Sequence, residues 1–176
     1  MRVIAGEFRS RRLKAPPGNE TRPTPDRLRE ALFSILAPIL EGAIFVDAYA
    51  GGGSVGIEAL SRGAGRVIFL EKNRGAAAII RENLASLGAA ERAEVRCVRA
   101  APALQALDAD IVFLDPPYPL QEEYRLALEA TSLNAGGIAI AQHASKHELA
   151  EQYGSLQQYR VLRQGDNSLS FYKKRV

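Results

Sequence analysis

The chain has 176 residues, of which 47% are apolar, and a formal net charge of +3. This length suits one domain with a sizeable core, and the composition is that of an ordinary globular protein. No apolar run approaches the ~18 residues of a membrane span, and the first residues lack the apolar core of a signal peptide. The lone cysteine, Cys97, excludes an internal disulfide and a cysteine-based zinc cluster. We therefore expect a cytoplasmic protein without a bound metal, and a monomer.

Positive charge is concentrated at the start of the chain. Residues 1–30 contain eight lysines and arginines against four acids, whereas the remaining 146 residues contain fifteen against sixteen. This asymmetry is typical of an arm that faces a polyanion, although a solvated tail would have the same composition. Val3-Ile4 favours a strand and Pro16-Pro17-Gly18 a turn, so residues 1–22 are predicted to form a basic hairpin or arm. Residues 23–176 are then predicted to form the one globular domain.

Strands and helices are expected to alternate along that domain. The first helix is predicted to follow Thr24 as N-cap, with Pro25 at its first position, because apolar residues then recur at helical spacing up to Ile39. Strands are predicted at 44–47, 66–71, 94–98, 110–115, 138–142, 159–163 and 169–173, and further helices at 54–62, 74–87, 102–107, 121–131 and 146–153. Gly63 and Gly88 are expected to end two of these helices. The alternation predicts an α/β fold: a Rossmann-like, doubly wound, mostly parallel seven-stranded sheet with an antiparallel C-terminal hairpin at its edge.

A glycine loop follows the first strand of the domain. Residues 51–56 read Gly-Gly-Gly-Ser-Val-Gly, and Glu71 stands 20 residues after Gly51, at the end of the second strand. Such a loop lets backbone approach a ligand, and the acid can accept hydrogen bonds from ribose hydroxyls. The pattern suits NAD as well as S-adenosylmethionine. Asp47 suits the cationic amino group of a methionine moiety, and the chain has no room for the second domain of a dehydrogenase, so the residues favour S-adenosylmethionine.

Asp115-Pro116-Pro117-Tyr118 is the strongest catalytic candidate. It follows the apolar run 111–114, which is short and β-branched or aromatic enough to be a buried strand. The two prolines stop strand pairing, so an acid and an aromatic residue are held at the carboxyl edge of the sheet, where α/β proteins bind ligands. Cys97 and the i,i+4 pair His143 and His147 lack such a context: we interpret the cysteine as a core residue and the histidines as surface or helix-start residues.

The motifs resemble those of a known family. Residues 115–118 are similar to the (Asp/Asn/Ser)-Pro-Pro-(aromatic) signature of methyltransferases that act on exocyclic amines of bases, and residues 46–54 are similar to their cofactor loop. The blocks 2–6, 9–13, 22–33 and 56–64 resemble the bacterial 16S ribosomal RNA guanine-N2 methyltransferase family. Of these, the block that starts Arg22-Pro23-Thr24 is specific to the family, whereas the other motifs are shared with many methyltransferases.

The resemblance implies methyl transfer from S-adenosylmethionine to the N2 amine of a guanine in 16S rRNA or in a small-subunit assembly particle, by direct transfer to a flipped base. It implies three groups of site residues. The catalytic residues are Asp115, Pro116, Pro117 and Tyr118; the cofactor-binding residues are Asp47, Tyr49, Ala50, Gly51, Gly53, Glu71, Lys72 and Ala100; the RNA-binding residues are Arg2, Arg9, Arg11, Arg12, Lys14 and Arg22. Arg27 and Arg29 either contact RNA or pair with Asp26 and Glu30.

The sequence departs from the family pattern at three positions. Arg99 precedes Ala100 where the family often has Asn or Asp, Gln142 stands where relatives often have Glu, and Ser10 where they often have Gly. Loss of the acceptor at Arg99 leaves the backbone N–H of Ala100 to contact the adenine.

Two other functions fit the same residues. The signature at Asp115 also serves adenine-N6 methylation of DNA or RNA, although the chain lacks a target-recognition domain. The protein could instead be an inactive RNA-binding assembly factor on a methyltransferase scaffold. Retention of Asp47, Glu71, Asp115 and Tyr118 together argues against that interpretation.

Overall fold

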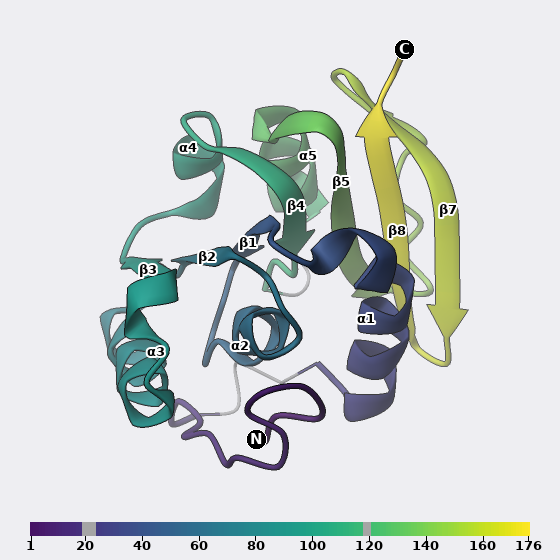
Figure 1. Ribbon diagram of the computed structural model, residues 1–176. Helices are drawn as coiled ribbons and strands as arrows, with labels where there is room; N and C mark the ends of the chain where they lie inside the picture. Colours follow the sequence, from purple (N-terminus) through teal and green to yellow (C-terminus); the bar gives the residue numbers. More distant parts are fainter. Residues whose placement is uncertain (19–23, 118–120) are drawn as a thin grey trace.

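A mixed eight-stranded sheet runs through the centre of the molecule, in a computed structural model that describes residues 1–18, 24–117 and 121–176 (Figure 1). The strand order is β3-β2-β1-β4-β5-β8-β7-β6, with parallel pairing from β3 to β5 and antiparallel pairing from β5 to β6. The strands are β1 Ile44–Ala48, β2 Arg66–Leu70, β3 Ala93–Arg96, β4 Asp108–Leu114, β5 Ser132–Ala144, β6 Gln152–Tyr153, β7 Leu156–Gln164 and β8 Asn167–Lys174. The predicted fold class is confirmed, but the predicted count of seven strands is wrong, because β6 is a two-residue strand too short to leave a sequence pattern.

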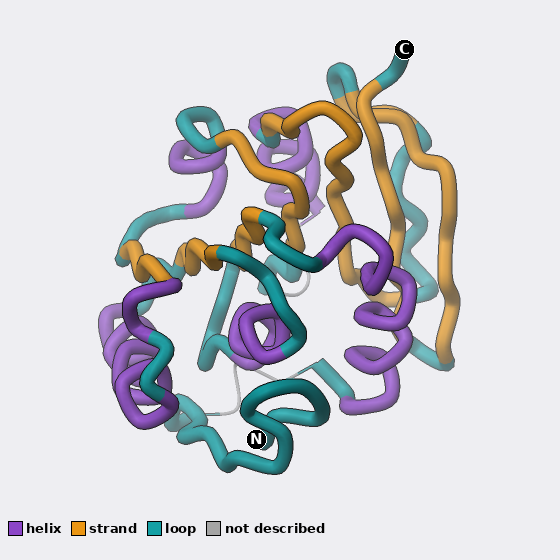
Figure 2. The backbone as a smooth tube through the Cα atoms, in the orientation of Figure 1, coloured by secondary structure: helices purple, strands orange, loops and turns teal. Residues whose placement is uncertain are grey.

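Helices cover both faces of the sheet (Figure 2). The helices are α1 Asp26–Leu40, α2 Ser54–Ser61, α3 Arg74–Leu87, the short 3-10 helix Ala90–Arg92, α4 Ala100–Leu104 and α5 Gln121–Ala130. One hydrophobic cluster joins α1, α2 and α3 to strand residues such as Phe45 and Phe69. The other joins α4 and α5 to the alternate strand residues, such as Val46 and Leu70. Within the described residues, no helix combines the length and apolar character needed to cross a membrane.

Local signals predicted α3 well and the start of α1 poorly. Gly88 ends α3 in the left-handed region at φ 67°, and the side chain of Asn73 caps its start by accepting from the N–H of Ala76. The predicted N-cap of α1 is wrong, because the hydroxyl of Thr24 donates instead to Gln142 at 3.0 Å in the core. A tertiary partner 118 residues away thus replaces the local one.

Three further interpretations are corrected by the fold. No helix forms at 146–153; the chain there makes turns and β6, and Ala150 hydrogen-bonds the hydroxyls of Tyr153 and Tyr172. His143 is a buried residue of β5 beside Ser170, not a surface or helix-start residue. Cys97 is exposed, because β3 ends at Arg96 instead of continuing to residue 98.

The first residues of the chain form a hairpin-like loop that is part of the core. Arg2 bridges Arg12, and Val3, Phe8 and Leu13 are buried in the cluster that holds α1, α2 and α3. The side chains at these three positions therefore point into the protein, while the basic ones remain exposed. Ser10, at φ 68°, occupies the left-handed region that favours glycine, which gives a physical reason for glycine at this position in relatives.

A buried carboxylate fastens this loop to α2. Glu58 is fully buried and accepts hydrogen bonds from the N–H groups of Ile4 and Ala5, at 2.8 and 3.1 Å. It also pairs with Arg62 and lies 3.7 Å from the buried Arg29, whose Nη2 donates to the carbonyl of Arg2. Arg29 also pairs with Asp26, so it is a structural residue.

We expect Glu58→Gln to destabilise the protein strongly. The amide cannot satisfy the two N–H groups as a carboxylate does, and it leaves the buried guanidinium of Arg29 with only the exposed Asp26 as a counter-charge; loss of the charge from a buried pair typically costs about 3–5 kcal/mol. Urea unfolding followed by circular dichroism measures the effect. Glu82→Gln, which breaks the exposed pair with Lys14, is the control and should cost less than about 1 kcal/mol. Equal losses from the two substitutions would contradict the role of Glu58.

Candidate active site

The carboxyl ends of β1, β2 and β4 meet at one edge of the sheet, beside β5, which continues to Ala144. Ala48 is in register with Leu70 and with Leu114, and Leu114 is in register with Ala141. The next residue of each strand therefore lies at the same edge. These residues are Tyr49, Glu71, Asp115 and Gln142. The first three are predicted site residues, and the parallel register alone brings them together from positions up to 66 residues apart.

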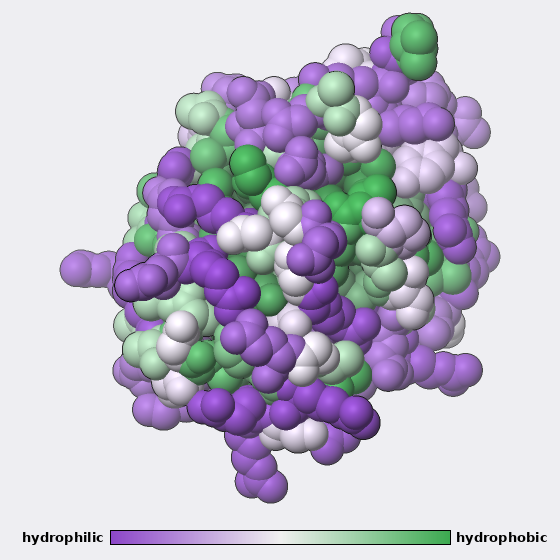
Figure 3. Space-filling view, viewed as in Figure 1, coloured by the Kyte–Doolittle hydropathy of each residue, from purple (hydrophilic) through white to green (hydrophobic). Residues whose placement is uncertain are grey.

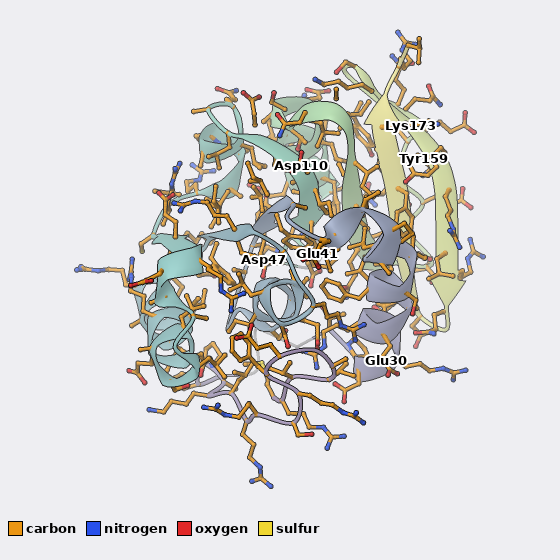
Figure 4. All side chains as sticks on the ribbon, in the orientation of Figure 1. Glu30, Glu41, Asp47, Asp110, Tyr159 and Lys173 are labelled. Atoms are coloured by element: carbon orange, nitrogen blue, oxygen red, sulfur yellow. The ribbon has the colours of Figure 1, made fainter. Side chains whose placement is uncertain are left out.

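Asp47 holds the glycine loop in place. Its side chain is 2% exposed, and Oδ2 accepts the N–H of Gly56 at 2.9 Å, so it ties β1 to the first turn of α2 (Figure 4). Burial raises its pKa well above the usual range, with further contributions from the nearby charges of Asp115 and Glu71. Negative charge is therefore crowded in this region, and a cationic ligand would relieve the repulsion.

The loop itself has a conformation that requires glycine. Gly51 and Gly53 lie at φ 57° and 85°, and Gly53 donates its N–H to the carbonyl of Ala50. A Cβ on Gly56 would lie 2.3 Å from the ring of Phe69, so only glycine allows α2 to approach β2 this closely. The hairpin-like loop of residues 1–17 reaches this turn too, because a Cβ on Gly52 would lie within 3 Å of Met1 and Pro16.

Tyr49 is fixed by an acid that the sequence analysis did not identify. It adopts φ 65°, an uncommon value for a non-glycine residue, and its hydroxyl donates to Glu123 at 2.7 Å. Burial and this hydrogen bond raise the pKa of the Tyr49 phenol. The other oxygen of Glu123 lies 3.9 Å from Arg99, the residue before α4. The sequence feature that could have identified Glu123 is its position in the first turn of the helix that follows the Pro-Pro motif.

Glu71 and Ala100 occupy the neighbouring part of the edge. Glu71 is partly buried, and burial raises the pKa of its carboxyl although the N–H groups of Asn73 and Lys72 bond to it. Lys72 is exposed, and Ala100 is buried at the start of α4. Within the described residues, no group of three or more His, Cys, Asp or Glu side chains is arranged to hold a metal ion.

Asp115 is partly exposed at the end of β4, followed by the buried Pro116 and the exposed Pro117. Burial raises the pKa of Asp115 to about 7. Its carboxyl therefore changes protonation near neutral pH, unlike an ordinary aspartate. Tyr118, the predicted aromatic partner, lies outside the described residues.

The predicted RNA-binding residues differ in whether their side chains already bind other groups of the protein. Arg2, Arg9 and Arg12 are exposed, and no ion pair to them occurs within the described residues. Arg11 donates to the carbonyl of Ser86, and Lys14 pairs with Glu82 on α3. Arg22 lies outside the described residues.

Comparisons with known proteins show the family of the chain. A model of the family described as "Conserved hypothetical protein 95" matches residues 1–173. The chain belongs to this family. YlbH of Bacillus subtilis (strain 168), which carries the name of an rRNA methyltransferase, is 37% identical over 99% of the chain and 100% of its own length. Ribosomal RNA small subunit methyltransferase D of Escherichia coli (strain K12) is 39% identical over 67% of the chain, although the match spans only 60% of that enzyme.

A solved structure extends the likeness to the whole fold. The Escherichia coli protein yhhF, named as a methyltransferase, superposes with a TM-score of 0.84 at 32% identity, over 99% of this chain and 97% of its own. The family recognised from the motifs, and its Rossmann-like methyltransferase fold, are thereby confirmed.

The raised pKa of Asp115 predicts how stability varies with pH. An unfolded aspartate has a pKa of about 3.9, so between about pH 4 and about pH 7 the folded state binds more protons than the unfolded state at this group. The free energy of unfolding therefore falls as pH rises through this range. Asp115→Asn removes this contribution, so its stability relative to the unsubstituted protein should increase as pH rises from 4.5 to 8. Urea unfolding at several pH values measures the difference in free energy of unfolding between the two proteins. A difference that does not change with pH would contradict the raised pKa of Asp115.

Proposed function

We propose that the protein is an S-adenosylmethionine-dependent rRNA methyltransferase that acts on the N2 amine of a guanine in 16S rRNA. The observation that carries the proposal is the position of Asp115, which the parallel register brings to the same edge as Asp47, Tyr49 and Glu71. The names of the most similar relatives, YlbH and small subunit methyltransferase D, support rRNA as the substrate. The choice of the guanine N2 amine rests on the family resemblance of the motifs.

The residues of the edge fit this cofactor. S-adenosylmethionine supplies an electrophilic methyl group on a cationic sulfur, and the crowded carboxylates favour such a cation. Asp47 would bind the amino group, the backbone of residues 49–53 the methionine moiety, and Glu71 the ribose hydroxyls. The backbone N–H of Ala100 would contact the adenine.

The acceptor amine needs orientation more than it needs a base. The lone pair of a guanine amine is delocalised into the ring, which makes the amine a poor nucleophile. Asp115 and the carbonyl of Pro116 would accept hydrogen bonds from its two N–H groups and so direct the lone pair at the methyl group. The proton that the methylated amine then loses would pass to the Asp115 carboxylate or to water. Such positioning supplies up to ~7–11 kcal/mol in favourable systems. Tyr118 would stack on the flipped base, a contact worth ~1–3 kcal/mol.

The exposed cations of the hairpin-like loop would bind phosphates near the site. Arg2, Arg9 and Arg12 lie on a loop that contacts the glycine turn through Met1 and Pro16. Phosphate contacts position the RNA without reading its sequence. Because these contacts do not select the base, we propose an assembled particle, in which ribosomal proteins present the base, as the preferred substrate.

The identity of the reaction is tested by transfer of labelled methyl groups. The protein is incubated with labelled S-adenosylmethionine and with unmethylated small subunits, free 16S rRNA or DNA, and the modified nucleoside is identified. We expect N2-methylguanosine, with small subunits the best substrate. N6-methyladenosine as the sole product would reject the proposed base. Cofactor binding without transfer to any substrate would favour the assembly-factor function.

Asp115→Ala should lower the rate of methyl transfer by at least ~100-fold, comparable to the loss of one group that stabilises a transition state in other enzymes. RNA binding measured by filter retention should be largely retained, because the residue contacts only the base. Asp108→Ala, at the opposite end of β4, is the matched control and should keep most of the activity. An unchanged rate for Asp115→Ala would reject its role.

A further inference from the structure

The C-terminal hairpin carries a second basic cluster that the average charge of the chain conceals. Residues 156–176 contain five lysines and arginines and one acid, whereas residues 31–155 contain ten lysines and arginines against fifteen acids. The net charge of residues 31–176 is near zero only on average. This region combines an acidic body with a basic hairpin formed by β7 and β8.

Two cations of this hairpin lie over aromatic rings. The guanidinium of Arg160 lies 5.8 Å from the ring centre of Phe171. The ammonium of Lys173 lies 5.0 Å from that of Tyr159 (Figure 4). A cation over an aromatic face is positioned without being neutralised. Arg163 has an acidic neighbour, Glu148, but at 3.9 Å with both side chains largely exposed, which is a weak pair.

The hairpin is also open on its outer side. β7 pairs along its length with β8, and on its other edge β6 pairs only with Leu156 and Gln157. Within the described residues no strand covers that edge from Tyr159 to Gln164. Tyr159 and Val161 are 43% and 47% exposed, and Figure 3 shows hydrophilic surface along the side of the molecule where Figure 1 draws β7. The exposed side chains of this edge are therefore accessible to a partner.

The turn of the hairpin lies at the same end of the sheet as the candidate active site, and its strands lead away from that end. Asn167 and Gln164 pair across the turn, and Asn167 pairs with Ala144 at the carboxyl end of β5. Arg163 therefore lies at the same end of the sheet as Asp115, although β5 and β8 separate their strands, while Arg160 and then Lys173 lie further along the hairpin. The strand from Tyr159 to Arg163 is about 13 Å long, which is comparable to the length of two or three nucleotides of RNA backbone.

From these observations we propose that the exposed surface of the β7–β8 hairpin, with Arg160 and Arg163 on β7 and Lys173 on β8, binds the phosphate backbone of the rRNA as it leads away from the target guanine. This rests on the proposed function, because it makes the occupant the same RNA whose base enters the site. Charge complementarity selects RNA, since three exposed cations lacking strong acidic partners lie on this hairpin. A simple edge-protecting role, the usual reason for charges on an edge strand, needs no aromatic positioning of the cations and does not account for Lys173, which lies on the inner strand β8.

The test is the salt dependence of binding to 16S rRNA, measured by filter retention for Arg160→Gln/Arg163→Gln/Lys173→Gln. Each lost phosphate contact should lower the slope of log affinity against log salt by ~0.7–0.9. We therefore expect a slope smaller by ~2–3 and an affinity at least ~10-fold weaker at low salt. Arg66→Gln/Arg81→Gln/Arg125→Gln is the matched control: it makes the same change in net charge at exposed sites on β2, α3 and α5, and it should alter the slope by less than ~1.

Measurements of RNA binding and of methyl transfer together distinguish failure of this proposal from failure of the proposed function. A hairpin variant that binds 16S rRNA with the affinity and the salt dependence of the unsubstituted protein would overturn the proposal. So would unchanged binding to free rRNA with weakened binding to assembled subunits, because the partner would then be a ribosomal protein. Weakened RNA binding by the hairpin variant, in a protein that transfers no methyl group, would support the surface while rejecting the proposed reaction.

Discussion

The hydrogen bond between the carboxylate of Asp47 and the N–H of Gly56 is the interaction on which the site depends. It joins the end of β1 to the start of α2 at 2.9 Å and thereby fixes the glycine turn between them. The bond requires a carboxylate that is almost fully buried within the influence of two further acids, Asp115 and Glu71. Burial raises the pKa of all three carboxyls, and the charges of Asp115 and Glu71 raise that of Asp47 further, so these groups do not stabilise the fold. The arrangement makes sense as a site prepared for a cation, since stability is commonly lower where function requires it.

The basic N-terminal segment is better understood as part of the fold than as an arm. Glu58 binds the N–H groups of Ile4 and Ala5, and Asn83 on α3 binds both the N–H and the carbonyl of Lys14. The backbone of the segment is therefore held at both ends, and Phe8 anchors its middle. Side chains such as Arg9 and Arg12 extend from fixed backbone, so binding a polyanion does not also have to order the chain. This reduces the entropic cost of the proposed RNA contact.

The sequence predicted best what depends on local chemistry or on the register of parallel strands. α3 has a capping Asn73 and a left-handed Gly88, and the edge that joins Asp47, Glu71 and Asp115 follows from placing each acid at a strand end. The failures involve distant partners. Thr24 is a good cap by type but hydrogen-bonds Gln142, and the apolar spacing at 149 and 153 serves packing under the C-terminal strands, not a helix. Glu123 was missed because nothing local links it to Tyr49, 74 residues away.

Taken together, the proposals explain how an acidic site can act on a polyanion. The carboxylates at the sheet edge attract a cationic methyl donor but repel phosphates. Phosphates would be bound on either side, by the exposed arginines of the N-terminal loop and by the β7–β8 hairpin, and held away from Asp115 and Glu71. Only an uncharged base, carrying an amine that can donate to Asp115, then has a favourable path to the edge. The same charge distribution that keeps the backbone out of the site thus favours an extruded base within it.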